Sequence, residues 1–318
     1  MPIFSRHQNK LTSINELNPK SYKESDLQRL AEANLEAVFG LIFVTTEFQL
    51  NGLRVDTLAF DAEAKAFVII EYKRDHSFSV VDQGYAYLSL MLNHKADFIL
   101  EYNEHMSKHL GKTDVDWSQS RVIFVANSFT TYQQQAINFR DLPMELWEAK
   151  YYSNDTVLFN RLKTPDSSES INTISKKSQT INEVSKEVKK YTVADHFTGA
   201  KAEWLPIYEE LCDRLMMIDE RIKENPRSGH IGLALGENGA STVIYIKPHN
   251  QKMTIEIPSI RPEDVDIMDP DGRITYMPNS FEHYNTPVSR FDIRNSDDVY
   301  YILPTIQWVM KRFGKWKS

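Results

Sequence analysis

The chain has 318 residues, which at roughly 150 residues per domain predicts two domains that each bury a core. Hydrophobic residues make up 41% and charged residues 25%, a balance that excludes a mostly disordered or collagen-like protein. The formal net charge is −7, so the chain lacks the broad basic footprint that usually meets a polyanion. Any binding of nucleic acid must therefore rest on a local site.

The single cysteine, Cys212, excludes an intramolecular disulfide and a cysteine-based zinc site. We therefore expect a reducing compartment, the cytoplasm. The first ten residues lack the apolar run of a secretory signal, and no segment approaches the roughly 18 to 20 consecutive apolar residues that cross a bilayer. The sequence predicts no membrane function.

The first half of the chain predicts helices around a β-meander. Apolar residues recur with helical spacing from Glu24, which predicts one amphipathic helix that ends at Gly40. Three β-rich runs follow, joined by turns at Asn51-Gly52 and at 61–65. The runs are residues 41–48, 53–60 and 66–73. We then expect helices at 78–93, 95–110 and 132–139, a buried strand at 121–126, and strands at 145–152 and 156–162.

A Ser/Thr/Lys/Glu-rich stretch without aromatic residues predicts a linker that ends in a weak helix. We therefore expect a first domain at 1–163, a linker at 164–195 and a second domain at 196–318. The second domain predicts a long helix at 201–224, four strands and a final helix, a smaller α+β arrangement. The later elements are expected at 230–235, 241–247, 252–257, 288–293 and 297–313.

Charged residues interrupt the predicted meander where its strands are otherwise apolar. Asp56 lies in the second run, and Glu71 and Lys73, two apart and so on one face, lie at the end of the third. Ionised groups are costly to bury unless they pair or bind a metal. A structural ion pair, a solvated strand end and a functional site are all compatible with Glu71 and Lys73 alone. Two carboxylates on neighbouring strands favour a divalent cation such as Mg²⁺ between them.

These residues resemble the signature of the PD-(D/E)XK nuclease superfamily. Asp56 matches its first acidic residue and Glu71-Tyr72-Lys73 its (D/E)-x-K element, while Val55 stands where a proline is expected. The resemblance implies an α/β chain whose restriction-endonuclease-like N-terminal domain has a mixed sheet flanked by helices. It also implies a Mg²⁺ cofactor, for which Mn²⁺ can substitute. The chain is similar, too, to bacterial proteins that carry an uncharacterised C-terminal domain.

Three further residues take roles from this resemblance. Glu36, on the helix before the meander, would be an additional metal ligand, although a solvated surface glutamate is the alternative. Gln83 and Tyr87 are four apart and share one helical face. At this place exonuclease-like members and archaeal-type mismatch endonucleases carry a Gln and sometimes a Tyr facing the site. A boundary glutamine and a core tyrosine are the alternative.

The remaining site residues would contact metal or phosphate. The carbonyl of Tyr72 would be a metal ligand, and Arg54 and Arg74 could contact phosphates or be rim charges. The catalytic set implied is Asp56, Glu71, Lys73, Gln83 and Tyr87.

The expected function is Mg²⁺-dependent hydrolysis of DNA phosphodiester bonds by an endonuclease in restriction, repair or antiviral defence. A catalytically inactive nuclease scaffold that binds nucleic acid or protein is the alternative. An RNA nuclease is a third hypothesis, since the motif addresses phosphates. A homodimer is compatible with cleavage of both strands. A protein or small-ligand partner for the C-terminal domain remains open.

Overall fold

The chain forms two compact units, Met1–Lys190 and Tyr191–Ser318, in a computed structural model. The structure describes residues 3–73, 79–137, 139, 142–162, 179–235, 241–278, 280–281 and 286–315. Much of the predicted linker, residues 164–178, lies outside the described residues. The predicted domain boundaries therefore stay a prediction. No helix in the described part of the chain is both long and apolar enough to cross a bilayer.

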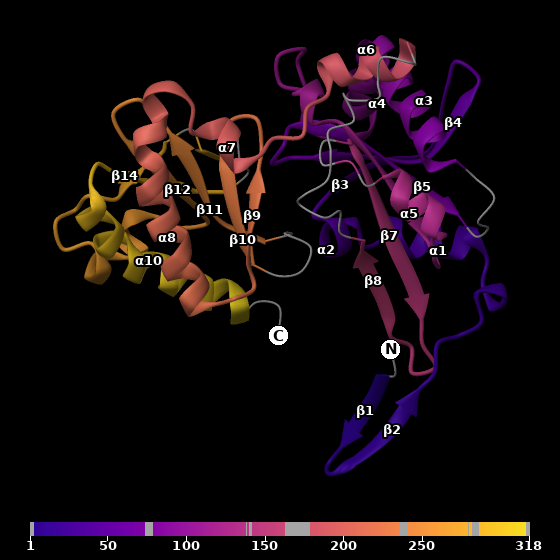
Figure 1. Ribbon diagram of the computed structural model, residues 1–318, viewed down its shortest axis with the longest axis horizontal. Coiled ribbons are helices and arrows are strands. Elements are labelled where there is room, and N and C mark those ends of the chain that lie inside the picture. The colour runs from indigo at the N-terminus through magenta and orange to yellow at the C-terminus, as the bar shows by residue number, and fades with distance from the viewer. Residues whose placement is uncertain are drawn as a thin grey trace. The chain divides into compact units, whose positions relative to one another are not determined.

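Six described strands of the N-terminal unit form one mixed sheet in the order β3-β4-β5-β6-β7-β8 (Figure 1). Strands β3, β4 and β5 pair antiparallel, β5, β6 and β7 pair parallel, and β8 returns antiparallel. The predicted fold class, a mixed sheet flanked by helices, is confirmed. The strands are β3 Ile42–Leu50, β4 Leu53–Asp61, β5 Ala66–Lys73, β6 Arg121–Ala126, β7 Met144–Tyr151 and β8 Val157–Arg161.

Helices cover both faces of this sheet. Strand β5 is central, so Phe67 and Ile69 pack into the core beneath α3 and α4, while Val68 and Ile70 pack on the face of α1 and α2. Helix α6 packs against α3 and buries Val184, so this helix of the predicted linker region belongs to the N-terminal unit. The helices are α1 Glu24–Glu32, α2 Leu35–Phe39, α3 Val80–Asn93, α4 Lys95–His105, α5 Thr131–Ala136 and α6 Gln179–Glu187.

The single helix predicted from Glu24 to Gly40 is wrong in one respect, because the structure divides it in two. Asn34 separates α1 from α2, and its side chain donates from Nδ2 to the carbonyl of Leu30 at 2.8 Å. Asparagine side chains compete in this way with backbone hydrogen bonding. The predicted end is confirmed, since Gly40 adopts a left-handed φ of 68° after α2. The break changes which side chains face the sheet.

An N-terminal hairpin was not foreseen in the sequence. Strand β1, Ile3–His7, pairs antiparallel with β2, Lys10–Ile14, and the two form a sheet of their own. Most of its side chains are exposed. A segment without a buried face lacks the hydrophobic alternation from which strands are predicted.

The C-terminal unit is an antiparallel sheet with two long helices, as the predicted α+β class requires. Its described strands have the order β13-β14-β12-β11-β10-β9. One apolar core joins the strands to α8 and α10. The elements are α7 Val193–His196, α8 Leu205–Ile218, β9 Ile222–Pro226, β10 Ile231–Leu235, β11 Ser241–Pro248, β12 Met253–Pro258, β13 Thr275–Tyr276, β14 Val288–Ile293 and α10 Ser296–Lys315.

The helix predicted at 201–224 is wrong at both ends. Residues Gly199–Trp204 form a 3-10 helix, α8 ends at Ile218, and β9 follows as a strand paired with β10. Ile222 is buried in the core of the sheet. Tertiary pairing therefore overrides a helical periodicity that continues past the real end of the helix.

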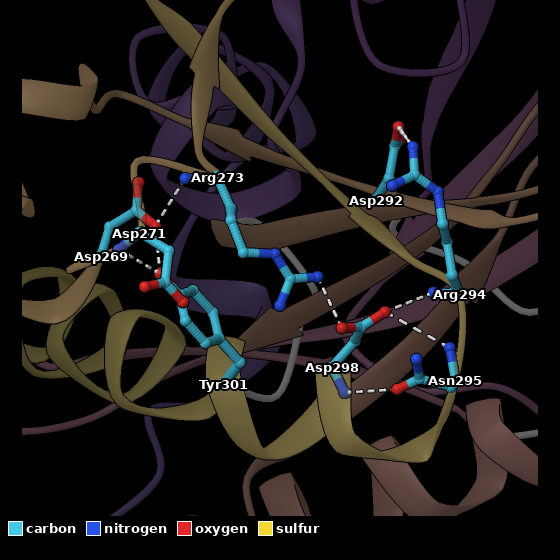
Figure 2. Close-up of polar contacts among 8 residues, drawn as sticks. All are labelled: Asp269, Asp271, Arg273, Asp292, Arg294, Asn295, Asp298 and Tyr301. Carbon is cyan, nitrogen blue, oxygen red and sulfur yellow. Dashed lines mark hydrogen bonds and ion pairs between the residues drawn. The ribbon is translucent and has the colours of Figure 1, made fainter.

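Buried aspartates tie the loop before β13 to α10 (Figure 2). Asp269 accepts hydrogen bonds from the backbone N–H groups of Arg273 and Ile274 and from the Tyr301 hydroxyl, at 2.7 to 2.9 Å. Asp298 accepts from the Arg273 guanidinium at 2.5 Å, and that guanidinium also lies over the Tyr301 ring. Each aspartate is satisfied by groups of the chain itself, so this network is a structural one.

Candidate active site

The two predicted carboxylates meet at the end of the β4–β5 ladder. The last backbone pair there joins Thr57 to Ile70, so Asp56 and Glu71 follow on adjacent strands. Beyond that pair, the Asp56 side chain replaces the backbone as acceptor: its Oδ2 accepts a hydrogen bond from the Tyr72 N–H at 2.9 Å. The strand pairing and this hydrogen bond hold both carboxylates at one place on the sheet.

Glu71 is the centre of a buried polar network. It is 3% exposed, although it lies near the end of a strand. Its Oε1 accepts from Lys73 Nζ at 2.6 Å and from Gln83 Nε2 at 2.8 Å, and its Oε2 accepts from the Tyr87 hydroxyl at 2.9 Å. A buried carboxylate needs partners of this kind, because burial of an unpaired charge is costly. The structure thus brings Asp56 and four predicted catalytic residues together.

Two side chains of α3, Gln83 and Tyr87, hold Glu71 by donating hydrogen bonds to its carboxylate. Gln83 has two amide protons and directs Nε2 to Glu71 and to the Tyr87 oxygen, the latter at 2.9 Å. Tyr87 has one proton, and its oxygen lies 3.1 Å from the carbonyl oxygen of Arg54 as well as near Glu71. The charged acceptor is favoured. Burial and the charge of Glu71 raise the pKa of Tyr87, so this donor keeps its proton.

The pKa of Asp56 is raised by its surroundings. Burial and the negative charge of Glu71 raise the pKa of Asp56 from 3.8 to about 6, against the opposing effects of the Tyr72 N–H and the Lys73 charge. Burial and the neighbouring Glu71 charge, in that order, make the Asp56 carboxyl group hard to ionise. A cation bound there would relieve the repulsion.

We expect Asp56→Asn to stabilise the metal-free protein at pH 7. Native Asp56, with its raised pKa, binds more protons than the unfolded state between pH 3.8 and about 6. Its stabilising contribution is thus present below pH 3.8 and is lost as the pH rises through about 6. Thermal unfolding in a chelator should show the variant more stable by about 1 to 3 kcal/mol at pH 7 and nearly equal at pH 4. Equal pH dependence in both proteins would contradict the raised pKa.

The two carboxylates fit Mg²⁺ better than a metal that prefers sulfur ligands or one that needs many protein ligands. Mg²⁺ is bound by one or two carboxylates and keeps several waters, so Asp56 and Glu71 meet its needs. Within the described ranges, no group of three or more His, Cys, Asp and Glu side chains is arranged to hold a metal ion. The Tyr72 carbonyl lies on the same stretch of β5 and is the third predicted ligand. Metal binding here stays a prediction.

Helix α1 approaches the site with residues that the sequence prediction missed. Gln28 donates from Nε2 to the Asp56 carbonyl oxygen at 3.0 Å, and Glu32 accepts from the Thr57 hydroxyl at 2.6 Å. The charge of Glu24 raises the pKa of Asp56 further. These three residues are spaced by four and share a helical face. This spacing of four is the feature of the sequence from which a shared face could have been predicted.

Glu36 continues the same spacing, but the structure does not place it in the network. It lies on α2, beyond the break at Asn34, and it is exposed. No described contact joins it to Asp56 or Glu71. The break explains this result, because residues four apart share a face only within one continuous helix.

The predicted phosphate-binding arginines have different outcomes. Arg54 is 56% exposed on β4 and lies 3.7 Å from a carboxylate oxygen of Glu47, so its side chain belongs to the rim. Arg74 lies outside the described residues. The Tyr72 side chain is buried on the opposite face of the sheet from Glu71, so only its backbone can take part in the site.

The fold and the site define a mixed-sheet α/β protein with a carboxylate and a lysine at the end of the central strand β5 and a second carboxylate on the neighbouring strand β4. No family model matches the chain. A Haemophilus influenzae protein, named only as uncharacterized, is 42% identical over 259 residues, which cover 81% of this chain and 84% of that protein. The chain belongs to the same family as that protein.

Two solved structures show a weaker likeness. They are an EndoMS complex with dsDNA, with 19% identity and a TM-score of 0.29, and a repair endonuclease from Pyrococcus abyssi, with 16% identity and a TM-score of 0.25. Each match covers 45% of this chain. The chain spans about half the length of each protein, 49% and 48%. At these scores the likeness supports no statement about the activity of this chain.

Proposed function

We propose that the N-terminal unit is a Mg²⁺-dependent nuclease that hydrolyses phosphodiester bonds in DNA. The observation that carries this proposal is the buried Glu71, held by Lys73, Gln83 and Tyr87 beside Asp56. A purely structural ion pair does not need a second carboxylate whose ionisation is opposed by the first. The resemblance of Asp56 and Glu71-Tyr72-Lys73 to the nuclease signature favours a phosphodiester as the substrate.

Asp56, Glu71 and the Tyr72 carbonyl would hold the metal. When bound, Mg²⁺ supplies positive charge to phosphate oxygens and acidifies a coordinated water. The protein contributes the fixed positions of the ligands. The Tyr72 N–H holds one oxygen of Asp56, and the three donors around Glu71 hold that side chain in one orientation.

Lys73 is the residue placed to act on the substrate. Its side chain is 24% exposed and is therefore only partly buried, and its ammonium group is paired with Glu71. A partly buried ammonium group stabilises charge that develops on a phosphate more strongly than one in water. Gln83 and Tyr87 act through Glu71 and are positioning residues in this account.

Cleavage by the full chain tests the proposal. Supercoiled, linear duplex and single-stranded DNA, and RNA of matched length, are each incubated with Mg²⁺, with Mn²⁺ or with a chelator. We expect cleavage of DNA only with metal, and we expect Asp56→Asn to lower its rate by about a hundredfold or more. Metal-independent cleavage at the same rate in the variant would show that the activity lies elsewhere. Cleavage of RNA but not of DNA would show that RNA is the substrate.

An inactive binding module is the second candidate, because protein donors already occupy both oxygens of Glu71. It predicts nucleic-acid binding without turnover. A ligand that binds only the folded state raises the melting temperature. Addition of Mg²⁺ or Mn²⁺ should therefore raise the melting temperature of the nuclease and leave that of an inactive module unchanged.

A further inference from the structure

The N-terminal hairpin is an exposed two-stranded ribbon. His7 pairs with Lys10 across a two-residue turn, and the side chains from Phe4 to Ser13 are exposed. Two strands without a covering layer are marginally stable in water. A ribbon of this kind contributes little to the stability of the unit. Its exposed side chains are available for contacts outside the chain.

The charge of the ribbon is opposite to that of the whole protein. The first fifteen residues contain no aspartate or glutamate, whereas the chain as a whole has a net charge of −7. Arg6, His7 and Lys10 gather around the turn, with Gln8 and Asn9 between them. The tip therefore carries positive charge and hydrogen-bond donors, and the chemistry that it fits is a polyanion.

The pairing register sorts the side chains onto two faces. His7 and Lys10 share one face with the hydroxyl residues Ser5 and Thr12, because directly paired residues point the same way. The other face carries Arg6 with two exposed apolar residues, Phe4 at 48% and Leu11 at 65%. The Arg6 Nε donates to the Gln8 carbonyl at 2.9 Å, which leaves its other N–H groups available for a phosphate.

The base of the ribbon is fixed to the end of β7. The Leu17 N–H donates to the Tyr151 carbonyl at 2.7 Å, and the Ser153 N–H donates to the Asn15 carbonyl at 2.9 Å. The Asn15 N–H donates in turn to the Ser153 hydroxyl at 3.2 Å. These contacts set where the ribbon leaves the unit, and Figure 1 shows it extending past the ends of β7 and β8.

The ribbon leaves from the same edge of the sheet as the candidate site. Strands β5, β6 and β7 are parallel, and their register places Lys73 level with Glu148. Tyr151 is three residues further along, about 10 Å beyond Lys73 along the strands and about 10 Å to the side across two strand spacings. The candidate site and the base of the ribbon therefore lie at the same edge of the sheet.

We propose that the hairpin, residues 3–14, is an arm that contacts a groove of duplex DNA beside the active site. The inference rests on the proposed function and names duplex DNA as the form of its substrate. A two-stranded ribbon fits the major groove of DNA. The ribbon follows the groove, and Arg6 and Lys10 contact phosphates.

Binding of a short fluorescein-labelled duplex, followed by anisotropy in a chelator, tests the arm without cleavage. Lys10→Glu is expected to weaken binding by about tenfold at low salt and to make the salt dependence shallower by about one unit of slope. The loss should be smaller with the corresponding single strand. Lys112→Glu is the matched control, since Lys112 is also exposed and lies in the segment before β6, which starts at the opposite edge of the sheet.

An equal effect of Lys10→Glu and Lys112→Glu on duplex binding would overturn the proposal. So would a change in oligomeric mass with no change in DNA affinity, because Phe4 and Leu11 would then serve a second copy of the chain. DNA cleavage together with DNA binding that does not depend on the hairpin would contradict the proposed arm and support the proposed nuclease function. Duplex binding that depends on the hairpin, with no cleavage in the presence of any metal tested, would support the proposed arm and contradict the proposed nuclease function.

Discussion

Lys73→Met is expected to lower the rate of DNA cleavage by about a hundredfold or more, with little loss of folded protein. The substitution keeps the length of the side chain and removes the ammonium group that lies 2.6 Å from Glu71. Loss of one group that stabilises developing charge typically costs this much in rate. Single-turnover cleavage with Mg²⁺ measures the effect, and circular dichroism checks the fold.

Lys150→Met is the matched control for that experiment. Lys150 follows Glu148 on β7 as Lys73 follows Glu71 on β5, and its side chain is 25% exposed against 24% for Lys73. Lys150 Nζ lies 3.6 Å from a carboxylate oxygen of Glu16 and 4.0 Å from one of Glu148, and no described contact joins it to Asp56. Equal rates for both variants and the unsubstituted chain would contradict the role of Lys73.

Arg121→Met is expected to destabilise the N-terminal unit by about 3 to 5 kcal/mol. The Arg121 side chain is 13% exposed and bridges Asp61 at 2.9 Å and Glu145 at 3.0 Å, which are themselves 4% and 11% exposed. Without the guanidinium, two carboxylates would remain buried without this partner. Urea unfolding measures the loss, and hydrogen exchange of the β6 amides assigns it to this unit.

Arg221→Met provides the comparison for stability. Arg221 pairs with Asp219 at 2.6 Å, but its side chain is 67% exposed. Solvent screens such a pair, so its loss should cost between about 0 and 1 kcal/mol. A destabilisation by Arg121→Met no larger than this would show that the buried bridge contributes little.

The sequence predicted the part of the site that depends on strand pairing. Asn51-Gly52 gives a tight turn, and the buried run before Glu71 gives a central strand, so the positions of Asp56 and Glu71 followed from local rules. The spacing of two placed Lys73 on the Glu71 face, where the structure has it. Gln83 and Tyr87 followed from the spacing of four on one helix.

The rest depended on tertiary context. The helix break at Asn34 moved Glu36 off the predicted face. The spacing of four puts Gln28 and Glu32 on one helical face, but only the packing of α1 on the sheet shows that this face contacts Asp56 and Thr57. Pairing of β9 with β10 shortened the predicted helix at 201–224 for the same kind of reason. Helical periodicity identifies a face but does not report where a helix ends.

The central claim is that Asp56 and Glu71 together bind a divalent cation. Crystals soaked in Mn²⁺ and measured at its absorption edge test this most directly, because the anomalous signal comes from the metal alone. We expect one peak in contact with oxygens of both carboxylates, and its loss in Asp56→Asn. Well-ordered carboxylates with no peak between them at saturating Mn²⁺ would contradict the account.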